Sequence, residues 1–224
     1  MHSKHSKLAI ALVLSTMVVA SNSRSLQLHN SVVAATHRQE GQLQPQLDPV
    51  LRDLRFGNES EHSAAKDLLI DLSKKSASAR ALIIEDLLRG IQCPNGSAEF
   101  VRNPTLYLEW TRATELIGLI RAEEAIDSLL QCLDCNNGVF LLSPDAFPAT
   151  RAIIEIGDKA IPNLAREIQT GTRLKKYLAA VALSEIGGER AKVDLEAAAR
   201  RTKDKDLAHT IRNLLKNWNS KSRK

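Results

Sequence analysis

The chain has 224 residues, of which 43% are hydrophobic but only 4% aromatic, and its formal net charge at pH 7 is +5. A core with so few aromatic residues has to be built from Leu, Ile and Ala, which suits closely packed helices because Ala lets neighbouring backbones approach. After the N-terminal stretch there is no run of 18 apolar residues, so we expect no membrane span in the mature chain.

The first 20 residues are typical of a secretory signal peptide. Lys4 and Lys7 precede residues 8–20, which carry no charge. As a helix this stretch would span about 20 Å, short of the roughly 30 Å hydrocarbon core of a bilayer. We expect cleavage after Ala20, export to the periplasm or the medium, and a flexible, polar leader over residues 21–46.

Residues 63–91 predict the first of several helical hairpins. Their apolar residues recur three or four positions apart in two stretches, with Ser73 at the expected corner. An insertion rich in turn-forming residues follows over about residues 91–105 and contains Cys93.

Three later segments repeat the hairpin pattern, at residues 110–130, 149–169 and 179–199. They align on three glycines, Gly118, Gly157 and Gly187. Apolar residues then fall five positions before, four after and eleven after each glycine, namely Ala113, Ala152 and Ala182, Ala122, Ile161 and Ala191, and Leu129, Ile168 and Ala198. These spacings describe one face of an α-helix, so each unit is predicted to be two helices joined by a tight corner.

The corner of the second of these segments carries specific helix stop and start signals. Gly157 can end the first helix with a positive φ, and Asp158 can cap the next helix through its side-chain oxygen. Pro162 then falls in the first turn, where a missing N–H costs least. A strand does not explain this cluster of signals.

The three cysteines lie at the ends of predicted second helices or just after them. Cys132 and Cys135 have CxxC spacing, but without a second CxxC or a nearby His there is no zinc site, and without a βαβ pattern there is no thioredoxin-like site. If neighbouring hairpins stack in parallel, Cys93 lies near both. We therefore expect a disulfide from Cys93 to Cys132 or to Cys135, with one thiol left over.

Two phrases carry a family resemblance: RAIIEIGDKAIP at residues 151–162 and ALSEIG at residues 182–187. They resemble the HEAT-like repeat family, in the short form of about 30 residues per unit found in phycobilin lyases. The resemblance implies an all-α, right-handed α-solenoid over residues 47–217, whose second helices line a concave surface, followed by a basic tail at residues 218–224. Such proteins mostly bind other macromolecules.

A contact surface can be selected from the helical phase. On each second helix, the residues out of phase with the apolar stripe are expected to face the concave side, whereas Ile161, Leu164 and Ile168 belong to the core. This selects Asp127, Gln131, Asn163, Arg166, Glu196 and Arg200.

The charge is uneven along the chain. Residues 151–224 contain 17 Lys and Arg against 9 Asp and Glu, whereas residues 21–150 contain 12 against 17. The basic C-terminal part would attract an acidic partner or an anionic envelope surface, and we expect the partner to be another protein. We expect no nucleic acid, because the basic residues are interspersed with acidic ones and few aromatic residues are available to stack on bases.

No catalytic motif, metal-ligand cluster or cofactor-binding motif is present in the sequence. We therefore expect a non-enzymatic binding or assembly module without cofactor or metal. The alternative is an enzyme or enzyme subunit, lyase-like or thiol-dependent, with a pocket between the insertions at residues 91–105 and 134–148 beside Cys132 and Cys135.

Overall fold

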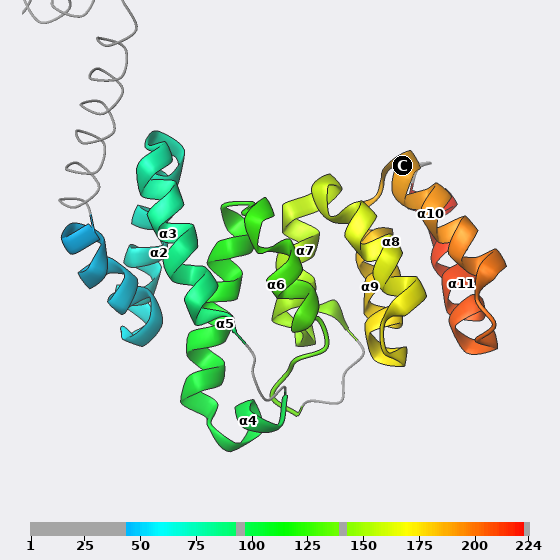
Figure 1. Cartoon of the computed structure of the whole chain (residues 1–224), viewed down its shortest axis with the longest axis horizontal. Coiled ribbons are helices and arrows are strands. Elements are labelled where there is room, and N and C mark those ends of the chain that lie inside the picture. The colour runs from blue at the N-terminus through cyan, green and yellow to red at the C-terminus, as the bar shows by residue number, and fades with distance from the viewer. Residues whose placement is uncertain (1–43, 93–96, 139–142, 222–224) are drawn as a thin grey trace, which may run out of the picture. The chain divides into compact units, whose positions relative to one another are not determined.

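The computed structural model describes residues 44–92, 97–138 and 143–221, and in these ranges the chain is all-α, without strands. From Gln46 onward it forms one compact unit, which starts with helical residues 46–56. The helices that follow are α2 (Glu59–Lys75), α3 (Ala77–Gly90), α4 (Ser97–Arg102), α5 (Pro104–Leu119), α6 (Ile126–Gln131), α7 (Pro148–Ile156), α8 (Ile161–Thr170), α9 (Arg173–Ile186), α10 (Gly188–Arg201) and α11 (Lys205–Lys221) (Figure 1).

Both ends of the expected domain differ slightly from the sequence-based boundaries. Residues 44–46, the last of the expected leader, are already helical. At the other end, α11 continues to Lys221, past residue 217. The expected signal peptide and the rest of the leader lie outside the described residues.

Short polar side chains set the beginnings of several helices. Asn58 forms a capping box at α2, where its Oδ1 accepts from the backbone N–H of Glu61 at 3.1 Å and the carboxylate of Glu61 accepts from the backbone N–H of Asn58 at 2.8 Å. The side chains of Ser76, Asn103 and Thr172 accept from the backbone N–H three residues later, at the starts of α3, α5 and α9. These starts depend on local sequence alone.

The corners of the last two aligned hairpins follow the prediction in part. Gly157 and Gly187 end α7 and α9, and both have a φ of +81°, a conformation that residues with a Cβ rarely adopt. Pro162 lies in the first turn of α8, as expected. The predicted cap was wrong: Asp158 lies in a 3₁₀ turn, and no side chain caps this turn or α8.

The two earlier corners lie later in the chain than the alignment predicts. Gly118 is inside α5 and Ser73 is inside α2, where its hydroxyl donates to the Ile70 carbonyl at 2.8 Å. The chain turns about one helical turn further on, at Arg121 with a φ of +51° and at Ser76. A glycine is needed at position 118 for a different reason, because the backbone of Ala152 approaches it too closely to leave room for a Cβ.

The predicted core register is confirmed by burial. Ala113, Ala152 and Ala182 are buried, as are the residues four positions after each aligned glycine. Leu129 and Ile168 are also buried, whereas Ala198 is half-buried. Ile161, Leu164 and Ile168 form the inner face of α8, as expected.

Packing within this unit follows the order of the chain (Figure 1). The first helices of successive hairpins contact one another in series, from α5 to α7, α9 and α11. The second helices α6, α8 and α10 do the same. The amphipathic helix α11 ends the unit and packs on α9 and α10 through Leu207, Ala208 and Ile211.

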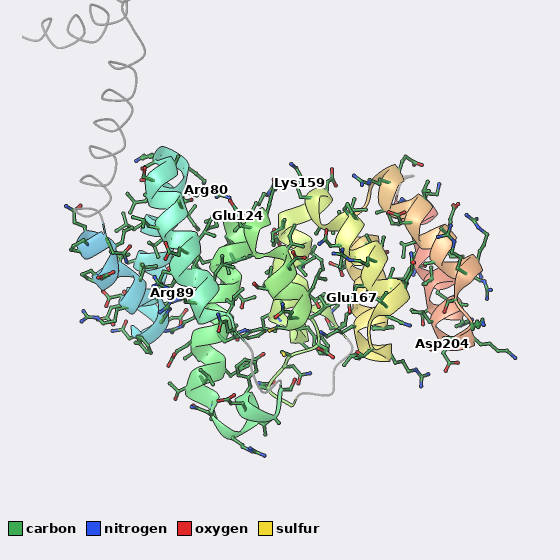
Figure 2. The ribbon with its side chains drawn as sticks, viewed as in Figure 1. Arg80, Arg89, Glu124, Lys159, Glu167 and Asp204 are labelled. Atoms are coloured by element: carbon green, nitrogen blue, oxygen red, sulfur yellow. The ribbon has the colours of Figure 1, made fainter. Side chains whose placement is uncertain are left out.

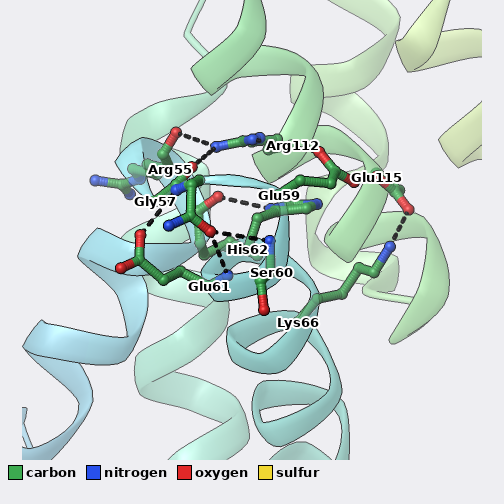
Figure 3. A network of polar contacts seen from close by, with 11 residues as sticks. Arg55, Gly57, Glu59, Ser60, Glu61, His62, Lys66, Arg112 and Glu115 are labelled. Atoms are coloured by element: carbon green, nitrogen blue, oxygen red, sulfur yellow. Dashed lines mark hydrogen bonds and ion pairs between the residues drawn. The ribbon is translucent and has the colours of Figure 1, made fainter.

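Cationic side chains from other hairpins cover several helix ends. Arg112 of α5, only 8% exposed, donates to the carbonyls of Arg55 at 3.0 Å and Gly57 at 2.8 Å (Figure 3). Lys175 of α9 donates to the carbonyls of Leu130 at 3.0 Å and Gln131 at 2.7 Å, at the end of α6. The last carbonyls of a helix have no intrahelical donor and carry partial negative charge. Each of these contacts reaches across one intervening hairpin, α2–α3 for Arg112 and α7–α8 for Lys175.

Among the described residues, no helix combines the length and apolarity needed to cross a bilayer.

Candidate functional site

The six residues selected from the helical phase lie on three second helices that contact one another in series. Asp127 and Gln131 are on α6, Asn163 and Arg166 on α8, and Glu196 and Arg200 on α10. Because α6 contacts α8 and α8 contacts α10, these helices form a row. We call their solvent-facing side the second-helix face.

Three of the six residues are brought together across two repeats. Asn163 donates from its Nδ2 to Oδ1 of Asp127 at 3.0 Å. The same carboxylate oxygen lies 3.9 Å from Nη2 of Arg166, whose side chain is 66% exposed. The cluster joins α6 to α8 and still leaves most of the guanidinium in solvent, available to another molecule.

The other three residues do not join this cluster through the contacts that the structure describes. Glu196 and Arg200 pair with each other along α10, with 3.9 Å between Oε2 and Nη1. The Gln131 side chain is exposed, and its backbone carbonyl accepts from Lys175. They belong to the same face but are separate contact points.

The positions of these residues relative to the aligned glycines Gly118, Gly157 and Gly187 give a sequence signal for the cluster. Asp127, Arg166 and Glu196 all lie nine positions after their aligned glycines, so charge alternates along the row of second helices. Six positions after the glycines lie Glu124, Asn163 and Val193. Val193 is 57% exposed and is the apolar member of this otherwise polar register.

Sequence reasoning missed a set of ion pairs at the N-terminal edge of the second-helix face. Glu123 and Glu124 lie in the 3₁₀ turn before α6. Lys159 reaches Glu123 at 3.3 Å from the next unit, and Arg80 reaches Glu124 at 3.9 Å from the preceding one (Figure 2). Arg80 also donates to the Ile120 carbonyl at 2.8 Å. The sequence signal that could have revealed these ion pairs is the pair of adjacent acidic residues, Glu123 and Glu124, directly after the turn at Arg121.

The described cysteines are buried. Cys132 forms no disulfide with another described residue, and its Sγ lies 3.7 Å from the Ile91 carbonyl, which also accepts from Nε1 of Trp110 at 3.1 Å. Cys135 is buried in the following turn. Cys93 lies outside the described residues, so the disulfide remains a prediction, although Cys132 does lie beside the segment that leads to Cys93.

Three hollows are formed between first helices. One of about 340 Å³ lies between α5 and α7, and two of about 430 and 360 Å³ lie between α9 and α11. Neither Cys132 nor Cys135 lines any of these three. Residues 93–96 and 139–142 of the two insertions lie outside the described residues, so the pocket expected between the insertions stays a prediction.

The histidines of the described ranges make structural contacts. The Nδ1 of buried His62 lies 2.8 Å from the Leu54 carbonyl, and Nε2 of His209 lies 3.0 Å from Nδ2 of Asn213. Within the described part of the chain no group of three or more His, Cys, Asp or Glu is placed to hold a metal ion.

Two side chains of the described ranges, Asp204 and Tyr107, have displaced pKa values. Two backbone N–H groups at the start of α11, those of Leu207 and Asp206, donate to Asp204 and hold its pKa below the ordinary value, with Arg173 and Lys176 adding a smaller effect. Burial raises the pKa of Tyr107, against a hydrogen bond to Thr111 that lowers it. Asp204 is a helix cap and Tyr107 packs with Phe100 and Trp110, so both shifts have structural causes.

Neither a protein-family model nor a curated protein sequence matches the chain.

Proposed function

We propose that this protein is a HEAT-like, right-handed α-solenoid that acts as a non-enzymatic binding or assembly module, and that a partner protein docks on the second-helix face. In this proposal the protein is exported after cleavage near Ala20. The observation that carries the proposal is the cluster of Asp127, Asn163 and Arg166, which spans α6 and α8 while Arg166 stays largely exposed.

The packing supports the solenoid part of the proposal. First helices contact first helices and second helices contact second helices, as expected of hairpins that cannot bury their apolar faces alone. The outward face of α11 presents Lys205, His209, Arg212 and Lys216, all exposed and spaced along one line of the helix. Such a polar terminal helix is what a repeat stack needs to end without exposing its core.

The second-helix face has the composition of a docking site. Arg166 and Arg200 are exposed arginines, which are enriched at the energetic centres of protein interfaces, and Val193 adds an exposed apolar contact. The cations Arg190 and Lys192 at the start of α10 form no ion pair within the described ranges and favour an acidic partner.

Affinity capture from the exported fraction of the source cell tests the proposal. The mature chain from Ser21 is compared with Arg166→Glu, Arg200→Glu and with the control Lys74→Glu, Arg102→Glu. The control makes the same change of net charge at exposed cations on α2 and α4 that form no ion pair within the described ranges.

We expect one protein to be recovered by the parent and the control and lost from the first double variant. Purified partner should then bind with a Kd at least about tenfold weaker for that variant. If both double variants lose the partner equally, only net charge is recognised and the second-helix face is not the docking site. If neither loses it, the partner binds elsewhere.

A further inference from the structure

A second interaction surface lies on the first helices, at the hollow of about 340 Å³ between α5 and α7. Its walls contain Thr111, Glu115 and Leu119 from α5 and Pro148, Arg151, Ala152 and Glu155 from α7, with Asp145 at one end. It shares no residue with the second-helix face, which is built from α6, α8 and α10.

Carboxylates outnumber cations at this hollow. The guanidinium of Arg151, 50% exposed, lies 3.0 Å from Glu155, 3.7 Å from Glu185 and 3.9 Å from Asp145. Glu115, at the opposite wall, pairs with Lys66 at 2.8 Å. Three carboxylates therefore share one guanidinium, and the ion pairs of the described residues bring only Arg151 and Lys66 to four carboxylates.

The floor and rim of the hollow offer apolar contact beside this charge. Leu119 is 43% exposed at its rim, and Pro148 and Ala152 contribute further apolar surface. An arginine or lysine side chain has the matching structure, since its alkyl stem packs on apolar surface while its charged end pairs with carboxylates. The volume is near the lower end of the roughly 300–1,000 Å³ typical of ligand sites, enough for one or two side chains.

We propose that the α5–α7 hollow docks a basic segment of a partner protein, with an arginine or lysine side chain entering beside Arg151. The incoming cation neutralises the excess of carboxylates around Arg151, and an adjacent apolar residue covers Leu119. Polyanions such as nucleic acids are disfavoured because the same carboxylates repel phosphate.

Fluorescence anisotropy with two short labelled peptides, one of alternating Arg and Leu and one of alternating Glu and Leu, tests the proposal on the mature chain from Ser21. We expect saturable binding of the basic peptide only. Asp145→Asn, Glu155→Gln should weaken it by about tenfold or more. The control Glu189→Gln, Asp194→Asn removes the same charge from α10, away from the hollow, and should change the Kd by less than about twofold.

A further variant should change the affinity for the basic peptide in the opposite direction. Arg151→Met removes the guanidinium that competes for the three carboxylates, so it should tighten binding of the basic peptide by about threefold or more, beyond the effect of the charge-matched Arg190→Met. Thermal unfolding of each variant, measured beside the wild type, checks that the variant is folded.

Equal weakening by both double variants, no binding of the basic peptide, preferential binding of the acidic peptide, or no difference between Arg151→Met and Arg190→Met would each overturn the assignment. The control variants lie on α10, so a basic peptide that bound the second-helix face would respond to them instead of to the variants at the hollow. Arg166→Glu, Arg200→Glu should not weaken binding of the basic peptide at the hollow.

Discussion

Gly118 of α5 faces Ala152 of α7 so closely that a Cβ added to Gly118 would lie 2.9 Å from the Cα of Ala152. The same Cβ would also lie 3.3 Å from the Cβ atoms of Ala152 and Glu155. Because Gly118 is helical, its value to the fold is its size and not its conformational freedom. The two first helices pack closely at this point.

The substitution Gly118→Ala therefore separates packing from helix propensity. Propensity alone predicts a gain of about 1 kcal/mol, because Ala is the better helix former. We expect instead a loss of about 1–3 kcal/mol, since α5 and α7 have to move apart. Chemical denaturation measures the difference, and an increased free energy of unfolding would show that the helices accommodate the methyl group.

Leu164 and Arg166 lie two residues apart on α8 and should differ in what they affect. Leu164 is fully buried, so Leu164→Ala should cost about 2–5 kcal/mol of stability through cavity formation. Arg166→Glu should change stability little, because the ion pair of Arg166 with Asp127 is exposed and 3.9 Å long. The same substitution should weaken binding of the partner protein. Denaturation curves measured beside partner binding check this, and equal stability losses would contradict the division.

Arg112 and Arg151 both lie six positions before their aligned glycines, yet only Arg112 is buried on helix-end carbonyls. Arg112→Met should cost about 1–3 kcal/mol, because it leaves the carbonyls of Arg55 and Gly57 without their donor. The Arg151 side chain is half-exposed and surrounded by carboxylates, so Arg151→Met should change the free energy of unfolding little. Similar losses in the two variants would argue against a special role of the contacts shown in Figure 3.

The lowered pKa of Asp204 predicts a pH-dependent contribution to stability. Folding favours the ionised carboxylate, so its contribution is fully present above its ordinary pKa of 3.8 and is lost as the pH falls through the lower folded value. Asp204→Asn keeps the oxygen that accepts from Leu207 and Asp206 but does not titrate. The wild type should melt higher than this variant near neutral pH, and the gap should close below pH 3.8. A gap independent of pH would contradict the assignment.

The position of Cys132 bears on the predicted disulfide of Cys93. The Sγ of Cys132 lies 3.7 Å from the carbonyl of Ile91, two residues before Cys93. Non-reducing peptide mapping of exported protein should recover Cys93 linked to Cys132 or to Cys135, and Cys93→Ser should abolish the linked peptide. Three free thiols, or a link between Cys132 and Cys135, would exclude it.

The sequence by itself determined that the chain is helical and where its hairpins bury their faces. The period of the apolar residues and the cap residues are local properties, so the buried register of Ala113, Ala152 and Ala182 and the turns at Gly157 and Gly187 could be predicted. The six residues of the candidate site were also placed on the correct helices, because helical phase is local too.

Only the tertiary structure decided what equivalent positions do. Gly118 aligns with two corner glycines but serves close packing, and Arg112 aligns with Arg151 but is buried on another helix end. Only three of the six candidate residues meet, through contacts of Asp127 with Asn163 and Arg166. In each case the deciding neighbour comes from another hairpin, whose distance, burial and charge are not encoded in the repeat register.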